Sequence, residues 1–106
     1  MIKISFFTNN ENEITGFDFN GHAEFAEEGN DVVCAAVSAL VFNTVNSIDK
    51  LTALDYDVKQ DEKKGHFYFR LKGNPDHDTN LLLNSLKLGV GKIQKDYGKK
   101  YIRIEK

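Results

Sequence analysis

NDVVCAAVSALVFNTVNSI, residues 30–48, is the stretch that predicts how this chain folds. Asn30 or Asp31 can cap a helix start there, because both side chains accept hydrogen bonds from free N–H groups. Few charges occur before Asp49, so we expect the helix to be buried on more than one side. Residues at helical spacing form one wide apolar face of this helix: Val33, Ala36, Val37, Leu40, Val41, Thr44, Val45 and Ile48.

A β-hairpin is predicted before this helix, over residues 1–19. Ile2, Ile4 and Phe6 alternate with polar residues, TNNENE forms a turn, and ITGFDF resumes the strand pattern. The apolar residues change parity near Gly16, which predicts a β-bulge that switches the face of the strand. Residues 20–30 then form a loop without a regular hydrophobic pattern.

After the helix, the pattern predicts two more strands, a second helix and a last strand. Asp76 or Asp78 can cap the second helix, and Gly98 can end it. The expected elements are a strand around residues 56–58, a turn at 61–65, a strand at 66–71, a helix up to Tyr97 and a strand within 99–105. The order β-β-α-β-β-α-β predicts an α+β fold: one domain, residues 1–106, with two helices on a mostly antiparallel sheet.

The composition is that of an ordinary soluble globular domain. The chain has 106 residues, 41% hydrophobic and 28% charged, with a formal net charge of −2. This balance gives no general attraction to nucleic acid or anionic lipid, so we expect no direct nucleic-acid binding. No apolar run of about 18 residues, no leader peptide and a single cysteine together predict a cytoplasmic protein without a membrane segment.

Cys34 is the only cysteine, and it falls in the first turn of the predicted helix. Free N–H groups and the helix dipole at that end favour a thiolate and can hold an oxyanion. His22, across the loop, is the nearest candidate for a base. From spacing alone two interpretations stay open: a nucleophile with its base, or a small buried hydrophobic residue with an unrelated histidine.

Four other residues of this region are candidates for supporting roles. Ser38 lies one helical turn after Cys34 and could orient the site, or it could bond back to a helix carbonyl. Asp31 could orient His22 besides capping the helix. Gly21 and Gly29 bracket the loop and could act as hinges of a lid.

Metal and cofactor sites are not expected. The DHD sequence at residues 76–78 offers three potential metal ligands, but adjacent residues diverge and no fourth ligand is evident. GVGK at residues 89–92 lacks the spacing of a phosphate-binding loop.

The stretch also resembles a known family. GHA at residues 21–23, Gly29, Asp31 and VCAAVSAL at residues 33–40 are similar to the signature of the ribosomal-processing cysteine protease Prp family. The resemblance implies a homodimeric cysteine endopeptidase that removes the N-terminal extension of a large-subunit ribosomal protein, the twenty-seventh. It also implies that the family's nucleophile and base fall on Cys34 and His22, with a mobile loop between them.

Two alternatives to this protease remain at the level of sequence. One is a non-catalytic ribosome-associated or RNA-binding module, favoured by the lysines of GKIQKDYGKK at residues 91–100. The other is a different thiol chemistry at Cys34, such as acyl or redox exchange. A lone cysteine has no resolving partner, which argues against dithiol redox chemistry.

Overall fold

The computed structural model describes residues 1–27 and 30–105, and the elements within these ranges follow the predicted order. A hairpin precedes the first helix, a second hairpin separates the helices, and a short strand ends the chain. The elements are β1 (Ile2–Thr8), β2 (Ile14–Asn20), α1 (Val32–Leu51), β3 (Tyr56–Asp61), β4 (His66–Leu71), α2 (His77–Tyr97) and β5 (Ile102–Glu105).

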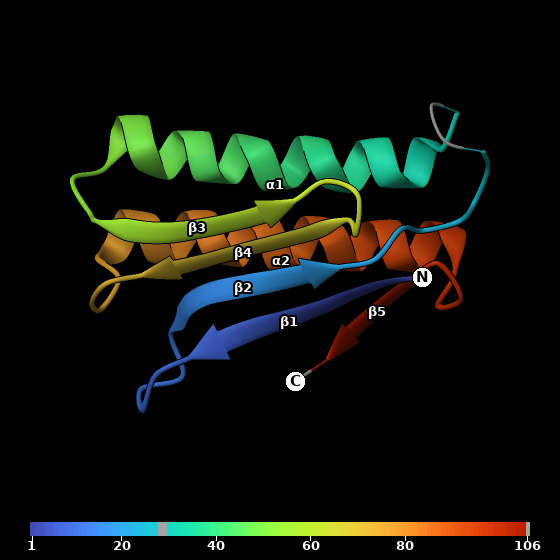
Figure 1. The fold of residues 1–106 in the computed structure, drawn as a ribbon. Helices are drawn as coiled ribbons and strands as arrows, with labels where there is room; N and C mark the ends of the chain where they lie inside the picture. The colour runs from blue at the N-terminus through green and yellow to red at the C-terminus, as the bar shows by residue number, and fades with distance from the viewer. Residues whose placement is uncertain (28–29, 106) are drawn as a thin grey trace.

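The strands form one sheet in the order β3-β4-β2-β1-β5 (Figure 1). The pairs β1–β2, β2–β4 and β3–β4 are antiparallel, and only β1 and β5 pair in parallel among the described strands. The two helices lie alongside each other on one side of the sheet (Figure 1). The predicted α+β fold with two layers and a mostly antiparallel sheet is therefore confirmed.

Alternation along the strands explains why both helices cover the same face. In β1, Ile2, Ile4 and Phe6 are buried while Lys3 is exposed, so only one side of the strand is apolar. The same alternation in β2 and β4 buries phenylalanines that pack together, such as Phe17 and Phe69 with ring centroids 5.1 Å apart. This apolar face has to be covered, and the helices α1 and α2 cover it.

A β-bulge lies where the sequence predicted a change of face. Phe7 pairs with Gly16 but Thr8 pairs with Ile14, so one residue of β2 is left without a partner. The extra residue allows both Ile14 and Phe17 to be buried although their parity differs. Gly16 itself is required by close approach, because an added Cβ would lie 2.3 Å from the main-chain oxygen of Phe69.

The expectation that helix α1 is buried on more than one side is wrong. Its buried residues fall on one face only, and its other side is open, with Val32 51% and Phe42 42% exposed. The low charge of this helix comes from small and uncharged polar residues on the exposed side, such as Ala35 and Ala39, rather than from burial all round. By length and composition α1 would suffice to cross a membrane, but core helices of globular proteins meet the same criterion, and its buried face packs in the core.

Two glycine substitutions test the close packing at the bulge. Gly16→Ala should lower the free energy of unfolding by about 1–3 kcal/mol, because the new methyl group meets main-chain atoms of β4 that cannot move aside. Gly91→Ala is the matched control: its Cβ would meet nothing within 4 Å, and alanine is the better helix former. Urea unfolding should therefore show destabilisation for Gly16→Ala and a small gain for Gly91→Ala. Equal midpoints for the two variants would contradict this account of Gly16.

Candidate active site

Asp31 is the N-cap of helix α1. Its Oδ1 accepts hydrogen bonds from the N–H groups of Val33 and Cys34, each at 3.0 Å. Its Oδ2 accepts the N–H of Phe25 at 3.0 Å, so the same carboxylate also holds the preceding loop. Of the two caps that the sequence offered, Asp31 is the one used, and Cys34 lies in the first turn as predicted.

The loop after β2 doubles back toward this helix start. Gly21 has a φ of +100°, and its N–H donates to the main-chain oxygen of Gly65 at 3.1 Å. Ala23 is buried, and its N–H donates to the sulfur of Cys34 at 3.1 Å. His22 stands between these two anchored residues, so the chain path holds it near Cys34.

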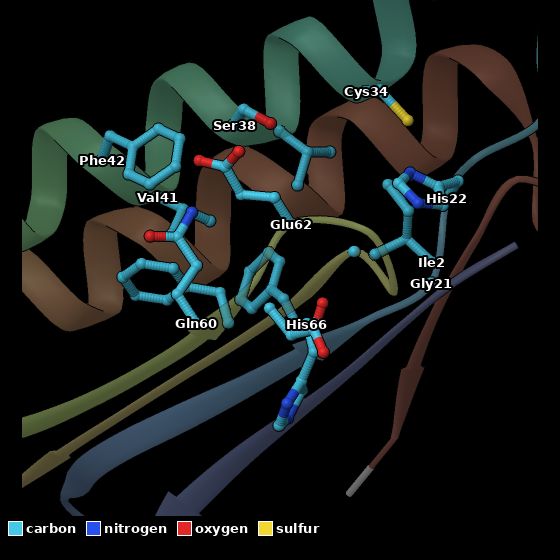
Figure 2. A pocket seen from close by; sticks show the side chains of 15 residues that line it. Ile2, Gly21, His22, Cys34, Ser38, Val41, Phe42, Gln60, Glu62 and His66 are labelled. Atoms are coloured by element: carbon cyan, nitrogen blue, oxygen red, sulfur yellow. The ribbon is translucent and has the colours of Figure 1, made fainter. Parts of the chain in front are cut away.

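His22 and Cys34 border the same two cavities. One, of about 250 Å³, lies between α1 and the β3–β4 hairpin (Figure 2). The other, of about 640 Å³, lies on the loop side of the sulfur. Ser38 and Glu62 also border both cavities, and Figure 2 shows Glu62 projecting toward Ser38 from the hairpin. The structure thus brings together His22, Cys34 and Ser38 from the sequence-based candidates.

The two cavities differ in chemistry. The smaller one has apolar walls from α1 and β4, including Val37, Val41 and Phe67, with Asp61 and Glu62 at its hairpin end. The larger one is bordered by carboxylates, those of Asp31, Glu24 and Glu62 among them. An extended chain lying across Cys34 therefore meets mainly apolar walls in the smaller cavity and several carboxylates in the larger one, with Glu62 bordering both.

The environment of Cys34 favours the neutral thiol. Burial raises the pKa of Cys34 most, the N–H of Ala23 opposes this, and the negative charge of Asp31 raises the pKa further. The net pKa is above the ordinary value for cysteine. The sequence suggested the reverse, because a free helix N-terminus stabilises a thiolate.

The choice of an aspartate as the cap explains this difference. Partial desolvation raises the pKa of Asp31, but hydrogen bonds from the backbone N–H groups of Cys34, Phe25 and Ala26 outweigh it and hold the pKa below its ordinary value. The N-terminus of α1 therefore already carries an anion. The N–H groups expected to hold an oxyanion are also engaged: those of Val33 and Cys34 by the Asp31 side chain, and that of Ala35 by the Asp31 main-chain oxygen.

The imidazole of His22 contacts the β3–β4 turn. Its Nε2 lies 3.2 Å from the main-chain oxygen of Lys63. Within residues 1–27 and 30–105 no hydrogen bond joins Asp31 to His22, and the carboxylate of Asp31 instead accepts backbone N–H groups. In this structure Asp31 therefore does not orient His22 through a hydrogen bond.

The structure bears differently on the predicted supporting roles of Ser38 and Gly21. In the described part of the chain Ser38 makes no hydrogen bond, so it does not bond back to a helix carbonyl as Thr44 does to Leu40. Gly21 is required by its positive φ and by the main-chain oxygen of Met1, which would lie 2.4 Å from an added Cβ. These constraints account for Gly21 without a hinge, and Gly29 lies outside the described residues.

Sequence reasoning missed the contribution of the β3–β4 turn to this site. Glu62 and Lys63 border the cavities, and Gly65 packs against the segment that carries His22. The sequence showed DEKKG only as a turn between two strands. Gly65 was the one available signal, because a glycine there permits a positive φ and a close approach.

The comparisons with known proteins agree with this geometry. The family model described as Cysteine protease Prp matches residues 1–103. The protein named ribosomal processing cysteine protease Prp from Staphylococcus aureus is 33% identical over 97 residues, covering 92% of each chain. The protein of the same name from Bacillus subtilis is 33% identical over 101 residues, covering 92% of this chain and 90% of that one.

Solved structures from S. aureus have the same fold. The essential ribosomal processing protease Prp in complex with a covalently linked product peptide superposes with a TM-score of 0.93 at 32% identity, covering 99% of this chain and 98% of that one. The same protease with a substrate peptide gives a TM-score of 0.87 at 31% identity with the same coverage. The match over nearly the whole chain, around a cysteine and a histidine that share a cavity, shows that this chain belongs to the cysteine protease Prp family and is a cysteine protease.

Proposed function

We propose that this chain is an endopeptidase that removes the N-terminal extension of a large-subunit ribosomal protein, the twenty-seventh, with Cys34 as nucleophile and His22 as general base. The observation that carries the proposal is the placement of both side chains on the same two cavities beside the start of α1. Relatives named for ribosomal processing, one solved with a covalently linked product peptide, support the substrate class.

The reaction begins from a neutral thiol. His22 takes the proton of Cys34 as the substrate binds, and the thiolate attacks the scissile carbonyl. The N–H of Ala23, 3.1 Å from the sulfur, is a donor beside the attacked carbonyl. His22 then gives the proton to the leaving amine, and water hydrolyses the thioester to release the acid and the thiol.

The linings of the two cavities favour a peptide substrate whose side chains differ on the two sides of the scissile bond. The apolar walls of the smaller cavity favour an apolar side chain on one side of the scissile bond. The carboxylates around the larger cavity favour basic residues on the other side. Ser38, on both cavities, is placed to donate a hydrogen bond to the peptide, and Asp31 supports the site by fixing the start of the helix.

The loop between His22 and Cys34 has to rearrange when a peptide enters. Ala23 donates to the sulfur, and Phe25 packs edge-on against Tyr97 and Tyr101, with ring centroids 5.4 and 5.1 Å apart. In the absence of substrate these contacts hold the loop against the first turn of α1, the end of α2 and Tyr101, which precedes β5. Opening this loop would expose the thiol only to an extended chain.

The proposal also covers the domain organisation, location and oligomeric state of the protein. We expect residues 1–106 to act as one protease domain in a cytoplasmic homodimer, without direct binding to nucleic acid. Exposed large apolar side chains on both helices, such as Phe42 and Leu88, support self-association. Membership of a cysteine protease family favours this function over the non-catalytic ribosome-associated or RNA-binding module, and over acyl or redox exchange.

A cleavage assay tests the proposed roles directly. An extended form of the ribosomal protein, followed by mass spectrometry, should be cut once by the wild type and not at all by Cys34→Ser. His22→Ala should lower kcat by about 100-fold or more, in the range for loss of a general base. His77→Ala is the matched control, because His77 is exposed at the start of α2. This variant should cleave the substrate at the wild-type rate. Normal cleavage by His22→Ala would remove His22 from the mechanism.

The second test concerns the pKa of Cys34. Because this pKa is raised, the alkylation rate should climb with pH and reach its midpoint above the ordinary cysteine value. Asp31→Asn removes the negative charge but keeps a capping side chain, so the pKa falls and alkylation at neutral pH rises about two- to fivefold, since a charge at a helix end is worth roughly 0.3–1 kcal/mol.

Asp76→Asn is the control for this variant, because Asp76 caps α2 and lies outside the cavities around Cys34. Its alkylation profile should match that of the wild type. Slower alkylation of Asp31→Asn than of the wild type would show that the carboxylate activates the thiol instead of restraining it.

A further inference from the structure

The β3–β4 turn is held against the segment that carries His22 by several main-chain constraints. Gly65 has a φ of +65°, and its oxygen accepts the N–H of Gly21 at 3.1 Å. A Cβ on Gly65 would lie 2.6 Å from the oxygen of Gly21 and 2.9 Å from Cε1 of His22. The turn and the histidine therefore touch without room for even a methyl group.

This packing brings one polar group of the turn to the imidazole. The main-chain oxygen of Lys63 lies 3.2 Å from Nε2 of His22. A carbonyl oxygen only accepts hydrogen bonds, so Nε2 has to carry the proton in this contact. The lone pair of the neutral ring is then on Nδ1, and Nδ1 is left as the atom that can accept the proton of a thiol.

We propose that the main-chain carbonyl of Lys63 is the positioning group of the active site: it holds the ring of His22 and selects the tautomer in which Nδ1 is the base for Cys34. Catalytic bases are commonly oriented by a third group of this kind. Among the described residues, the carboxylate of Asp31 is hydrogen-bonded to the N–H groups of Phe25, Val33 and Cys34 and not to His22. The inference rests on the proposed role of His22 as base, and it adds the β3–β4 turn to the machinery.

The tautomer can be measured without any substrate. Protein labelled with ¹⁵N in its histidines, at a pH where imidazole is neutral, shows by two-bond ¹H–¹⁵N couplings which ring nitrogen carries the proton. The three histidines are told apart by the variants His66→Gln and His77→Gln. We expect His22 to be a single tautomer, protonated on Nε2. A proton on Nδ1, or an equal mixture of tautomers, would overturn the proposal whether or not the protein cleaves its substrate.

Two substitutions in the turn separate the carbonyl from the side chain. Gly65→Ala forces the turn away from Gly21 and His22, so the signal should become a mixture of tautomers, and kcat should fall about 10- to 100-fold with a much smaller change in KM. Lys63→Ala keeps the carbonyl and should leave the tautomer unchanged. Gly73→Ala is the control for a loop glycine, because its Cβ would meet nothing within 4 Å, and it should keep both the tautomer and kcat.

The outcomes distinguish this inference from the proposed function. If Gly65→Ala does not fold, which circular dichroism would show, the tautomer of the wild type still decides the question. If the wild type shows a fixed Nε2–H tautomer but does not cleave the ribosomal protein, the proposed orientation of His22 stands and the proposed substrate is rejected. Cleavage with an unchanged tautomer and unchanged kcat in folded Gly65→Ala would reject the positioning role and keep the protease.

Discussion

The carboxylate of Asp31 is the group on which the rest of the site depends. It accepts two N–H groups at the start of α1 and thereby fixes where the helix begins. That boundary places Cys34 in the first turn, beside the loop. The same carboxylate accepts the N–H of Phe25, so one side chain sets both the position of the thiol and the return path of the chain that carries His22. An anion at this point also makes the thiolate less favourable.

This arrangement suits the proposed cleavage of one peptide bond rather than of many. A thiol with a raised pKa reacts slowly with adventitious electrophiles, because the thiolate is the nucleophile. In the proposed mechanism, activation requires His22 and a bound peptide together. Phe25 packs on Tyr97 and Tyr101, and the proposed opening of the loop has to break this contact.

Much of the fold could be predicted from residues that interact locally or alternate regularly. The strand pattern of Ile2, Ile4 and Phe6, the caps at Asp31 and Asp76, and the bulge next to Gly16 all follow from short-range sequence features, and all occur in the structure. The exposure of one side of α1 was not predictable in this way. A helix sequence with few charges is compatible with an outer face that is covered by another layer and with one that is exposed to solvent. Here Ala35 and Ala39 are exposed to solvent.

The sequence by itself determined the elements, their order, and the placement of Cys34 at a helix start with His22 at the other end of a loop, because these depend on neighbours along the chain. Only the tertiary structure decided which groups surround His22 and Cys34. The Lys63 carbonyl contacts His22, 41 positions away in the sequence, and Gly65 contacts Gly21 beside the neighbouring strands β4 and β2. Neither contact leaves a side-chain pattern, since both are made by main-chain atoms. The pKa of Cys34 likewise depends on burial and on the charge of Asp31, which folding brings together around one sulfur.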